Sequence, residues 1–398
     1  MKHKLKFVFC LIFVLTAGNF IVPGIGCASE PLIIGMLHWE EYPYAEMMRN
    51  SYQMALELIN KEGGIKGRPL KLVYGDDQGE REPGEKVVRE LAKKGAVMLT
   101  GGYASSNTIY TARIANKLDI PFLICTAADD RITHRKWENV FRLNPPASEY
   151  TKGLEDFFLK EIRPKTMAIV YENSPYGTGS ALRMMWFCRE HDIEIRKIIP
   201  YHKERAGSAY FQRILAPLKE EPPDVIYMVS YLKDGVALVK KIREMKINAL
   251  LCGGAGGFTH QKFVTMAGES ADNLVTVSLW HHQSKYPRAK AYYNQHVEKY
   301  SETPDYHGAE AYSALLVAAD ALRRAESYDS ANIRATLNQT DMKTPFGPVK
   351  FSNYRKFERQ NSFPTLVLQI IQNKFECIWP KDLVTSKFVS PSDWRRSD

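Results

Sequence analysis

Three small polar residues near the end of the first quarter of the chain have the types and spacing of an anion site. Ser105, Ser106 and Asn107 follow an apolar run at 97–100 and a pair of glycines, and a helical pattern begins directly after them. The run suits a buried strand, and any of the three side chains could cap the helix. Such a loop leaves free backbone N–H groups at the positive end of the helix dipole. It therefore predicts a site for a carboxylate or another anion, with an ordinary strand–helix turn as the alternative.

The elements around this loop alternate between strands and helices. Before residue 144, apolar runs predict strands at 32–37, 70–74, 97–100 and 120–125, and helical stripes occur at 44–61, 85–94 and 108–117. The alternation restarts after Asn144-Pro145-Pro146, with strands expected at 167–171, 193–200, 225–229, 250–252 and 274–279. This order predicts an α/β protein with doubly wound parallel sheets. Ligands bind such sheets outside the carboxyl ends of the strands, where the 101–107 loop lies.

The start of the chain has the pattern of a secretory signal peptide. Three lysines among the first six residues precede an almost wholly apolar run at 7–21, and small residues stand at 26–28. We therefore exclude residues 1–28 from the fold and expect a periplasmic or extracytoplasmic protein, freed by cleavage after Ala28. A lipid anchor at Cys27 is the alternative. No later apolar run reaches the roughly 18 residues of a membrane span.

Composition and motifs exclude several classes of function. The net charge of +9 is spread along helices among acidic residues, without a basic stripe, so we expect no nucleic-acid partner. The six cysteines form no CxxC pair, which argues against a zinc site or a disulfide framework. The chain lacks a phosphate-binding GxxxxGK loop, an HExxH helix and a GxSxG elbow. We therefore expect no catalytic residues, no metal and no cofactor.

Several short motifs, taken in order, resemble one family. The run from Gly63 to Leu70 followed by Asp76-Asp77, and the run Tyr176-Gly177-Thr178-Gly179, resemble loops of the leucine/isoleucine/valine-binding protein family. Segments 268–271 and 372–374 and the ending Trp379-Pro380 also fit. Members of this family are periplasmic type I solute-binding proteins of ABC importers. The resemblance covers residues 31–380, which is nearly the whole chain after the leader.

The resemblance implies two doubly wound lobes joined by three crossing strands, the type I periplasmic binding protein fold. The crossings are expected near Asn144, at 277–280 and at 347–351. Lobe 1 would hold 29–144 and 280–346, and lobe 2 would hold 145–279 and 347–380, followed by a loosely held tail at 381–398. We expect a monomer that closes on a small amino-acid-like or carboxylate ligand in the cleft between the lobes and docks on an ABC permease in the membrane. A ligand-sensing module of a receptor or regulatory system is the alternative.

The resemblance also assigns the ligand-binding residues. Ser105 matches the family residue that binds the ligand carboxylate, and the segment Thr126-Ala127-Ala128 matches the loop that grips the amino-acid head group. Because alanine stands at position 128, where the family has threonine, only backbone contacts carry over there. The aromatic residues expected to line the cleft are Tyr44, Tyr176 and Tyr231, with Trp39 and Trp280 as further walls.

Two departures from the family bear on the ligand. The acidic partner of the ligand ammonium falls at Ala255, and the two cysteines of a first-lobe disulfide fall at Gly79 and Ala104. An ammonium group buried without a counter-charge is costly. An apolar or aromatic carboxylate, or a neutral amide-like solute, is therefore favoured over leucine, isoleucine or valine. The alternative is that another acid replaces the missing one, with four candidates: Glu40, Glu41, Asp129 and Asp130.

Overall fold

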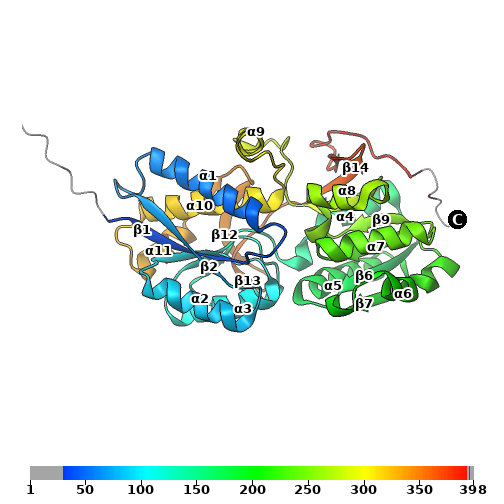
Figure 1. The fold of residues 1–398 in the computed structure, drawn as a ribbon, viewed down its shortest axis with the longest axis horizontal. Helices are drawn as coiled ribbons and strands as arrows, with labels where there is room; N and C mark the ends of the chain where they lie inside the picture. Colours follow the sequence, from blue (N-terminus) through cyan, green and yellow to red (C-terminus); the bar gives the residue numbers. More distant parts are fainter. Residues whose placement is uncertain (1–29, 392–393, 395–398) are drawn as a thin grey trace, which may run out of the picture.

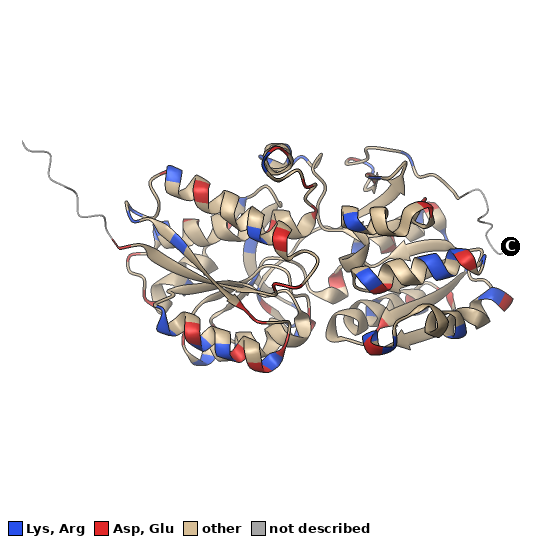
Figure 2. Ribbon diagram, in the orientation of Figure 1, with Lys and Arg blue, Asp and Glu red and all other residues tan. Residues whose placement is uncertain are grey.

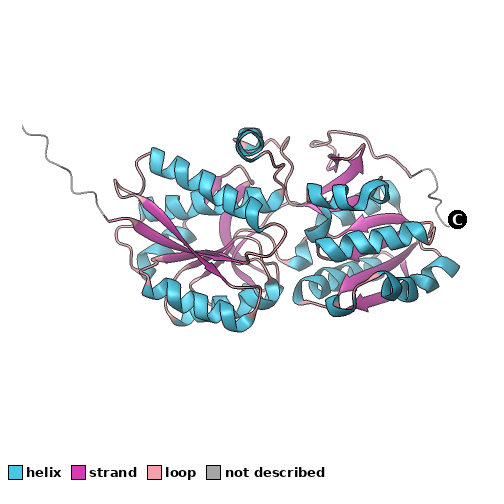
Figure 3. Ribbon diagram, in the orientation of Figure 1, coloured by secondary structure: helices cyan, strands magenta, loops and turns pink. Residues whose placement is uncertain are grey.

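The protein consists of two α/β lobes, each built on its own sheet (Figures 1 and 3). A computed structural model describes residues 30–391 and 394. The proposed leader, Cys27 and most of the last seven residues lie outside the described part. Lys, Arg, Asp and Glu are interspersed over the helices of both lobes (Figure 2).

The first lobe holds an eight-stranded sheet of order β11-β12-β13-β5-β4-β3-β1-β2. Its strands are β1 (Leu32–His38), β2 (Leu70–Asp76), β3 (Met98–Gly101), β4 (Phe122–Ile124), β5 (Val140–Arg142), β11 (Asp341–Lys343), β12 (Pro348–Tyr354) and β13 (Phe357–Asn361). Its helices are α1 (Ala45–Lys61), α2 (Arg81–Lys93), α3 (Ser105–Lys117), α9 (Ala289–Tyr300), α10 (Tyr306–Arg324) and α11 (Ser330–Asn338). Strands β1 to β5 pair in parallel, as the alternation predicts.

The second lobe holds a seven-stranded sheet of order β15-β14-β10-β9-β8-β6-β7. Its strands are β6 (Thr166–Glu172), β7 (Glu194–Tyr201), β8 (Val225–Val229), β9 (Leu250–Gly253), β10 (Val275–Ser278), β14 (Leu366–Ile371) and β15 (Lys374–Trp379). Its helices are α4 (Lys152–Phe157), α5 (Pro175–Glu190), α6 (Ser208–Glu220), α7 (Leu232–Glu244) and α8 (Gln261–Ala267). The fold class predicted from the sequence is confirmed.

Helix α5 shows why the chain folds as it does near the cleft. Pro175 occupies the first helical turn, where a missing N–H costs nothing. The Ser174 hydroxyl accepts the N–H of Gly177 at 3.2 Å and so satisfies one of the free donors at the helix start. Ser174 and Pro175 thereby fix the start of the helix, where Tyr176 lies next to the other lobe.

The third crossing differs from the prediction. The chain stays in the first sheet through β12 and β13, which form an antiparallel pair, and passes to β14 of the second sheet between Asn361 and Leu366. The polar sequence of β13 does not look like a strand. It pairs with β5 because the buried Gln360 amide donates to the Asn144 carbonyl at 2.6 Å and its oxygen accepts from Arg142 at 2.6 Å. Residues 347–361 therefore belong to the first lobe.

The end of the chain is also more firmly held than expected. The Gln369 side chain of β14 donates to the carbonyl of Val389 at 2.7 Å and accepts its N–H at 2.8 Å. The described part of the tail is therefore tied to the second sheet. The four described cysteines are free and buried, and no helix in the described part is long and apolar enough to cross a membrane.

Candidate functional site

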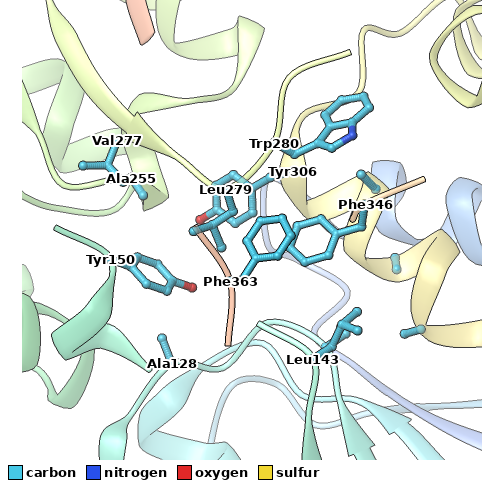
Figure 4. Packing of buried hydrophobic residues seen from close by; sticks show 14 of the residues in the cluster. Ala128, Leu143, Tyr150, Ala255, Val277, Leu279, Trp280, Tyr306, Phe346 and Phe363 are labelled. Carbon is cyan, nitrogen blue, oxygen red and sulfur yellow. The ribbon is translucent and has the colours of Figure 1, made fainter. Parts of the chain in front are cut away.

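A small cavity lies between the two lobes, at the carboxyl ends of their central strands. Its volume is about 20 Å³, which is room for roughly one water. We call it the inner cavity; its lining residues are Tyr103, Ser105, Thr126, Ala128, Tyr150, Tyr176, Tyr231, Gly256, Tyr306 and His307. Five of these ten are tyrosines, so the site is mainly aromatic. In Figure 4, Tyr150 lies between Ala128 and Ala255, and Tyr306 lies farther from Ala128.

Ser105 lies where the sequence places it, at the start of α3, but it does not cap the helix. The N-cap position is Ala104, which makes no side-chain capping bond. The Ser105 Oγ instead accepts the N–H groups of Ala128 and Asp129 at 3.0 and 3.1 Å. Since both bonds use lone pairs, the hydroxyl proton remains available for donation to a carboxylate. The prediction that a polar side chain caps this helix is wrong, because the serine oxygen joins two loops.

The loop after β4 contributes two of its three predicted residues to the inner cavity. Thr126 and Ala128 line it, whereas Ala127 does not. The N–H of Ala127 donates to the Gly102 carbonyl, and the Ala127 carbonyl accepts from the buried Arg142 guanidinium. These backbone hydrogen bonds hold the loop in place. The Asn144 amide donates to the Thr126 carbonyl at 2.7 Å. This hydrogen bond joins the first crossing, at Asn144, to the loop after β4.

The three predicted tyrosines lie at the cleft, in different roles. Tyr176 and Tyr231 line the inner cavity, and the Tyr176 hydroxyl donates to the Gly254 carbonyl at 2.7 Å. Tyr44, just before α1, is fully buried, and its hydroxyl donates to the Gly256 carbonyl of the other lobe at 2.7 Å. Tyr44 therefore holds the lobes together, whereas the other two tyrosines form the wall of the cavity.

The two predicted tryptophans do not line the inner cavity. Trp280 lies at the second crossing, where its indole N–H donates to the Pro345 carbonyl at 2.9 Å and its ring packs edge-on against Tyr292. In Figure 4 it lies on the far side of Tyr306 from Ala128. The Trp280 side chain is therefore a buried packing residue of the second crossing. Trp39 is not among the residues that line the inner cavity, and the centroid of its ring lies 4.8 Å from that of Tyr42.

The sequence gives no signal for several aromatic residues of the site. The rings of Tyr42 and Tyr103 are tilted by 38° with centroids 4.1 Å apart, and both rings also lie close to Tyr231 across the cleft. We call these three tyrosines the aromatic layer. Burial raises the pKa of each of their hydroxyls well above its ordinary value, so the aromatic layer is uncharged at neutral pH. These residues come from three separate loops that only the folded chain brings together.

A buried contact between an aspartate and a histidine marks the border between the lobes. The Asp305 carboxylate lies 3.0 Å from His307 Nδ1 and accepts a hydrogen bond from Thr259 of the second lobe at 2.9 Å. Although burial alone raises it, His307, His260 and Thr259 together hold the pKa of Asp305 below its ordinary value. The carboxylate is therefore a charged contact between the two lobes.

None of the expected substitutes for the acid missing at Ala255 lines the inner cavity. Asp129 pairs with Arg131 at 2.7 Å, Asp130 with Lys356 at 3.0 Å, and Glu40 with Arg49 at 3.1 Å. Glu41 is exposed at the mouth of the cleft. Ala255 itself is fully buried.

Glu310 is a buried acid beside this site that the sequence analysis missed. It lies on α10 one turn after Tyr306, is fully buried, and neither carboxylate oxygen has a hydrogen-bond partner in the described structure. Burial raises the pKa of Glu310 well above its ordinary value, although the facing Thr126 hydroxyl lowers it. Burial therefore favours the protonated form of this acid. An acidic residue on the apolar face of a helix, among alanines and Tyr312, is the signal that could have identified it.

Comparisons with known proteins place this two-lobed chain in a family. The family model described as periplasmic binding protein matches residues 40–373. The chain therefore belongs to the periplasmic binding protein family, as the sequence motifs predict. Within the described residues, no group of three or more His, Cys, Asp or Glu side chains could hold a metal ion.

Individual relatives agree with this assignment. The Leu/Ile/Val-binding protein homolog 7 of Brucella suis biovar 1 (strain 1330) is 24% identical over 393 residues, covering 93% of this chain and 97% of that protein. The leucine-, isoleucine-, valine-, threonine-, and alanine-binding protein of Pseudomonas aeruginosa PAO1 is 23% identical over 316 residues, covering 77% of this chain and 81% of that protein. The relatives carry the names of binding proteins.

Solved structures share the fold at low identity. The branched-chain amino acid transporter substrate binding protein LivJ from Streptococcus pneumoniae str. Canada MDR_19A, in complex with isoleucine, has a TM-score of 0.79 at 23% identity, covering 87% of this chain and 98% of that chain. An ABC transporter solute binding protein from R. palustris, in complex with benzoate, has a TM-score of 0.78 at 18% identity, covering 92% and 99%. Both confirm the type I fold.

Proposed function

We propose that this chain is the extracytoplasmic solute-binding component of an ABC importer, and that it holds a small carboxylate ligand between its lobes. The observation that carries the proposal is Ser105, whose hydroxyl proton is free at the start of α3 and beside the inner cavity. A hydroxyl and a helix N-terminus together favour an anion. The partner of the closed form is an ABC permease, and the protein acts as a monomer and not as an enzyme.

The ligand class follows from the charges at the site. The position of the family's ammonium partner holds the methyl group of Ala255, and burial raises the pKa of the nearby Glu310 well above its ordinary value, which favours its protonated form. A zwitterion would leave its ammonium group uncompensated in this aromatic site. We therefore favour an apolar or aromatic carboxylate over a branched-chain amino acid. The relative solved with benzoate supports this class, and the relative solved with isoleucine supports the runner-up.

The size of the cavity implies a movement of the lobes. A volume of about 20 Å³ is too small for benzoate or leucine, so the lobes separate to admit a ligand and close around it. The cross-lobe bonds from Tyr44 to Gly256 and from Thr259 to Asp305 are the contacts that would break. Ligand binding should therefore change the shape of the molecule.

A thermal-shift screen tests the proposed ligand class. The panel contains benzoate, leucine, isoleucine, valine and the corresponding des-amino acids. A ligand present at roughly a hundredfold excess over its Kd stabilises the folded protein by about 2.7 kcal/mol. We expect stabilisation by benzoate or a des-amino acid. Stabilisation by the branched-chain amino acids alone would show that the ligand ammonium has a partner after all.

A further inference from the structure

A second cavity lies next to the inner cavity, between loops of the two lobes. Its volume is 470 Å³, far larger than that of the inner cavity, and Tyr231 lines both. We call it the outer chamber. Its aromatic wall consists of Trp39, Tyr42 and Tyr231. The centroid of the Tyr42 ring lies 4.8 Å from that of Trp39 and 5.9 Å from that of Tyr231. Flat aromatic faces next to a cavity are suited to bind cations and apolar groups.

The chain makes room for this wall at Gly79. A Cβ atom on that residue would lie 2.8 Å from the Trp39 ring, closer than side chains approach one another. Glycine therefore lets the indole lie flat against the loop after β2. Both Gly79 and Ala104 line the chamber. They occupy the two positions where the resemblance places the cysteines of a first-lobe disulfide that this chain lacks.

The polar lining of the outer chamber is predominantly acidic. Four carboxylates, from Glu41, Glu172, Glu204 and Asp234, face two ammonium groups, from Lys203 and Lys233. His202 is the remaining titratable side chain besides Tyr42 and Tyr231. The chamber thus combines aromatic faces with an excess of negative charge.

Glu172 is an unusual member of this lining, because it is buried and incompletely paired. It ends β6, is only 4% exposed, and its Oε2 has no hydrogen-bond partner in the described structure. Burial and then the nearby Asp234 carboxylate raise the pKa of Glu172 to about 7, although Lys203 lowers it. Among the described residues no Lys or Arg forms a salt bridge with Glu172, in contrast to Asp129 and Asp130, which are paired with Arg131 and Lys356.

Asp234 provides a second acid of the same kind. It lies in the first turn of α7, and burial raises its pKa to about 6, with Glu204 adding to the rise and Lys203 opposing it. A cation between Asp234 and Glu172 would stabilise the ionised form of both.

We propose that the outer chamber is a binding subsite for an organic ammonium ion, with Glu172 and Asp234 as its acceptors and Trp39 and Tyr42 as its aromatic wall. An ammonium ion attached to an apolar body matches both halves of the lining. This subsite is distinct from the carboxylate position at Ser105, and it stands whether or not the inner cavity takes a carboxylate.

Calorimetric titration with benzylamine near pH 8 tests the proposal, with benzyl alcohol as the neutral probe of matched shape. Charge-assisted hydrogen bonds are stronger than neutral ones, so we expect benzyl alcohol to bind at least about tenfold more weakly. Glu172→Gln should weaken benzylamine binding about tenfold, and Asp234→Asn should weaken it as well. Thermal unfolding of each variant verifies that it is folded.

Two controls separate this subsite from general charge effects and from the proposed function. Glu220→Gln removes an exposed acid at the end of α6, outside the chamber, and should leave benzylamine binding unchanged. Ser105→Ala should also leave it unchanged, even though it weakens carboxylate binding. The proposal is overturned if benzyl alcohol binds as tightly as benzylamine, if both Glu172→Gln and Asp234→Asn bind like the unmodified protein, or if Glu220→Gln weakens binding as much as Glu172→Gln.

Discussion

The hydroxyl of Tyr44 in the first lobe donates a 2.7 Å hydrogen bond to the carbonyl oxygen of Gly256 in the second lobe. The same glycine N–H donates to the Tyr306 hydroxyl at 3.2 Å, so Gly256 is held by the first lobe from two sides. Two polar contacts to one glycine thus join the lobes beside the inner cavity.

Removing the Tyr44 hydroxyl should loosen this closure. A net hydrogen bond contributes about 0.5–1.5 kcal/mol, so Tyr44→Phe should shift the ratio of open to closed molecules by roughly two- to tenfold. Small-angle scattering of the ligand-free protein should then show a larger radius of gyration. Tyr52→Phe is the matched control, because Tyr52 is equally buried but bonds Thr100 within the first lobe. Identical profiles for the two variants would rule out a closing role for Tyr44.

Ser105→Ala should weaken carboxylate binding by about 1.5–3 kcal/mol, since it removes a hydrogen bond to a charged group. It should also lower the melting temperature, because the N–H groups of Ala128 and Asp129 lose their acceptor. Calorimetry with a carboxylate found in the thermal-shift screen measures the first effect. The exposed neighbour Ser106 supplies the control Ser106→Ala, which should bind normally. Equal affinity in the two variants would remove Ser105 from the site.

Glu310 should destabilise the protein at neutral and alkaline pH. Its ordinary pKa is 4.5, and the folded value lies well above this. Between the two values the unfolded chain has lost the proton while the folded chain keeps it, so stability falls as pH rises. Glu310→Gln should therefore raise the melting temperature at about pH 8 and change it little at about pH 4. The exposed Glu298 on α9 provides the control Glu298→Gln; equal shifts in both variants would contradict the assignment.

Ammonium binding in the outer chamber should depend on pH with a defined sign. Glu172 and Asp234 have pKa values of about 7 and 6 in the folded protein, so both are largely ionised at about pH 8 and largely protonated at about pH 5. Benzylamine affinity should therefore fall as pH is lowered, and the fall should be smaller in Glu172→Gln. Glu41, Glu204, His202, Lys203 and Lys233 line the same chamber and keep their own titration in that variant. An affinity independent of pH would contradict the role of the two acids.

The alternation of strands and helices could be predicted because the central strands β3, β4, β6, β8, β9 and β10 are buried runs, most of them apolar, and the helices between them have an apolar face. Strand β13 could not be predicted in this way, because it is polar. Its residues Gln360 and Asn361 are buried, and their side chains donate hydrogen bonds to backbone carbonyls of the first crossing. This is also why the third crossing was placed too early.

The site divides in the same way. Ser105 and the loop around Thr126 could be located from local sequence, because a strand–loop–helix order defines them. Tyr42, Tyr103 and Tyr306 come from loops and a helix far apart in the chain, and the lobes bring their rings together. No local pattern marks such residues.

The most direct test of the proposed function is mass spectrometry of the small molecules that the protein retains. The protein is purified without refolding, denatured, and the released molecules are identified and quantified against the protein. Our account predicts a single small carboxylate that lacks an α-amino group, at close to one molecule per chain, and its loss from Ser105→Ala purified in parallel. A stoichiometric molecule without a carboxylate group, or a carboxylate retained equally by Ser105→Ala, would contradict it.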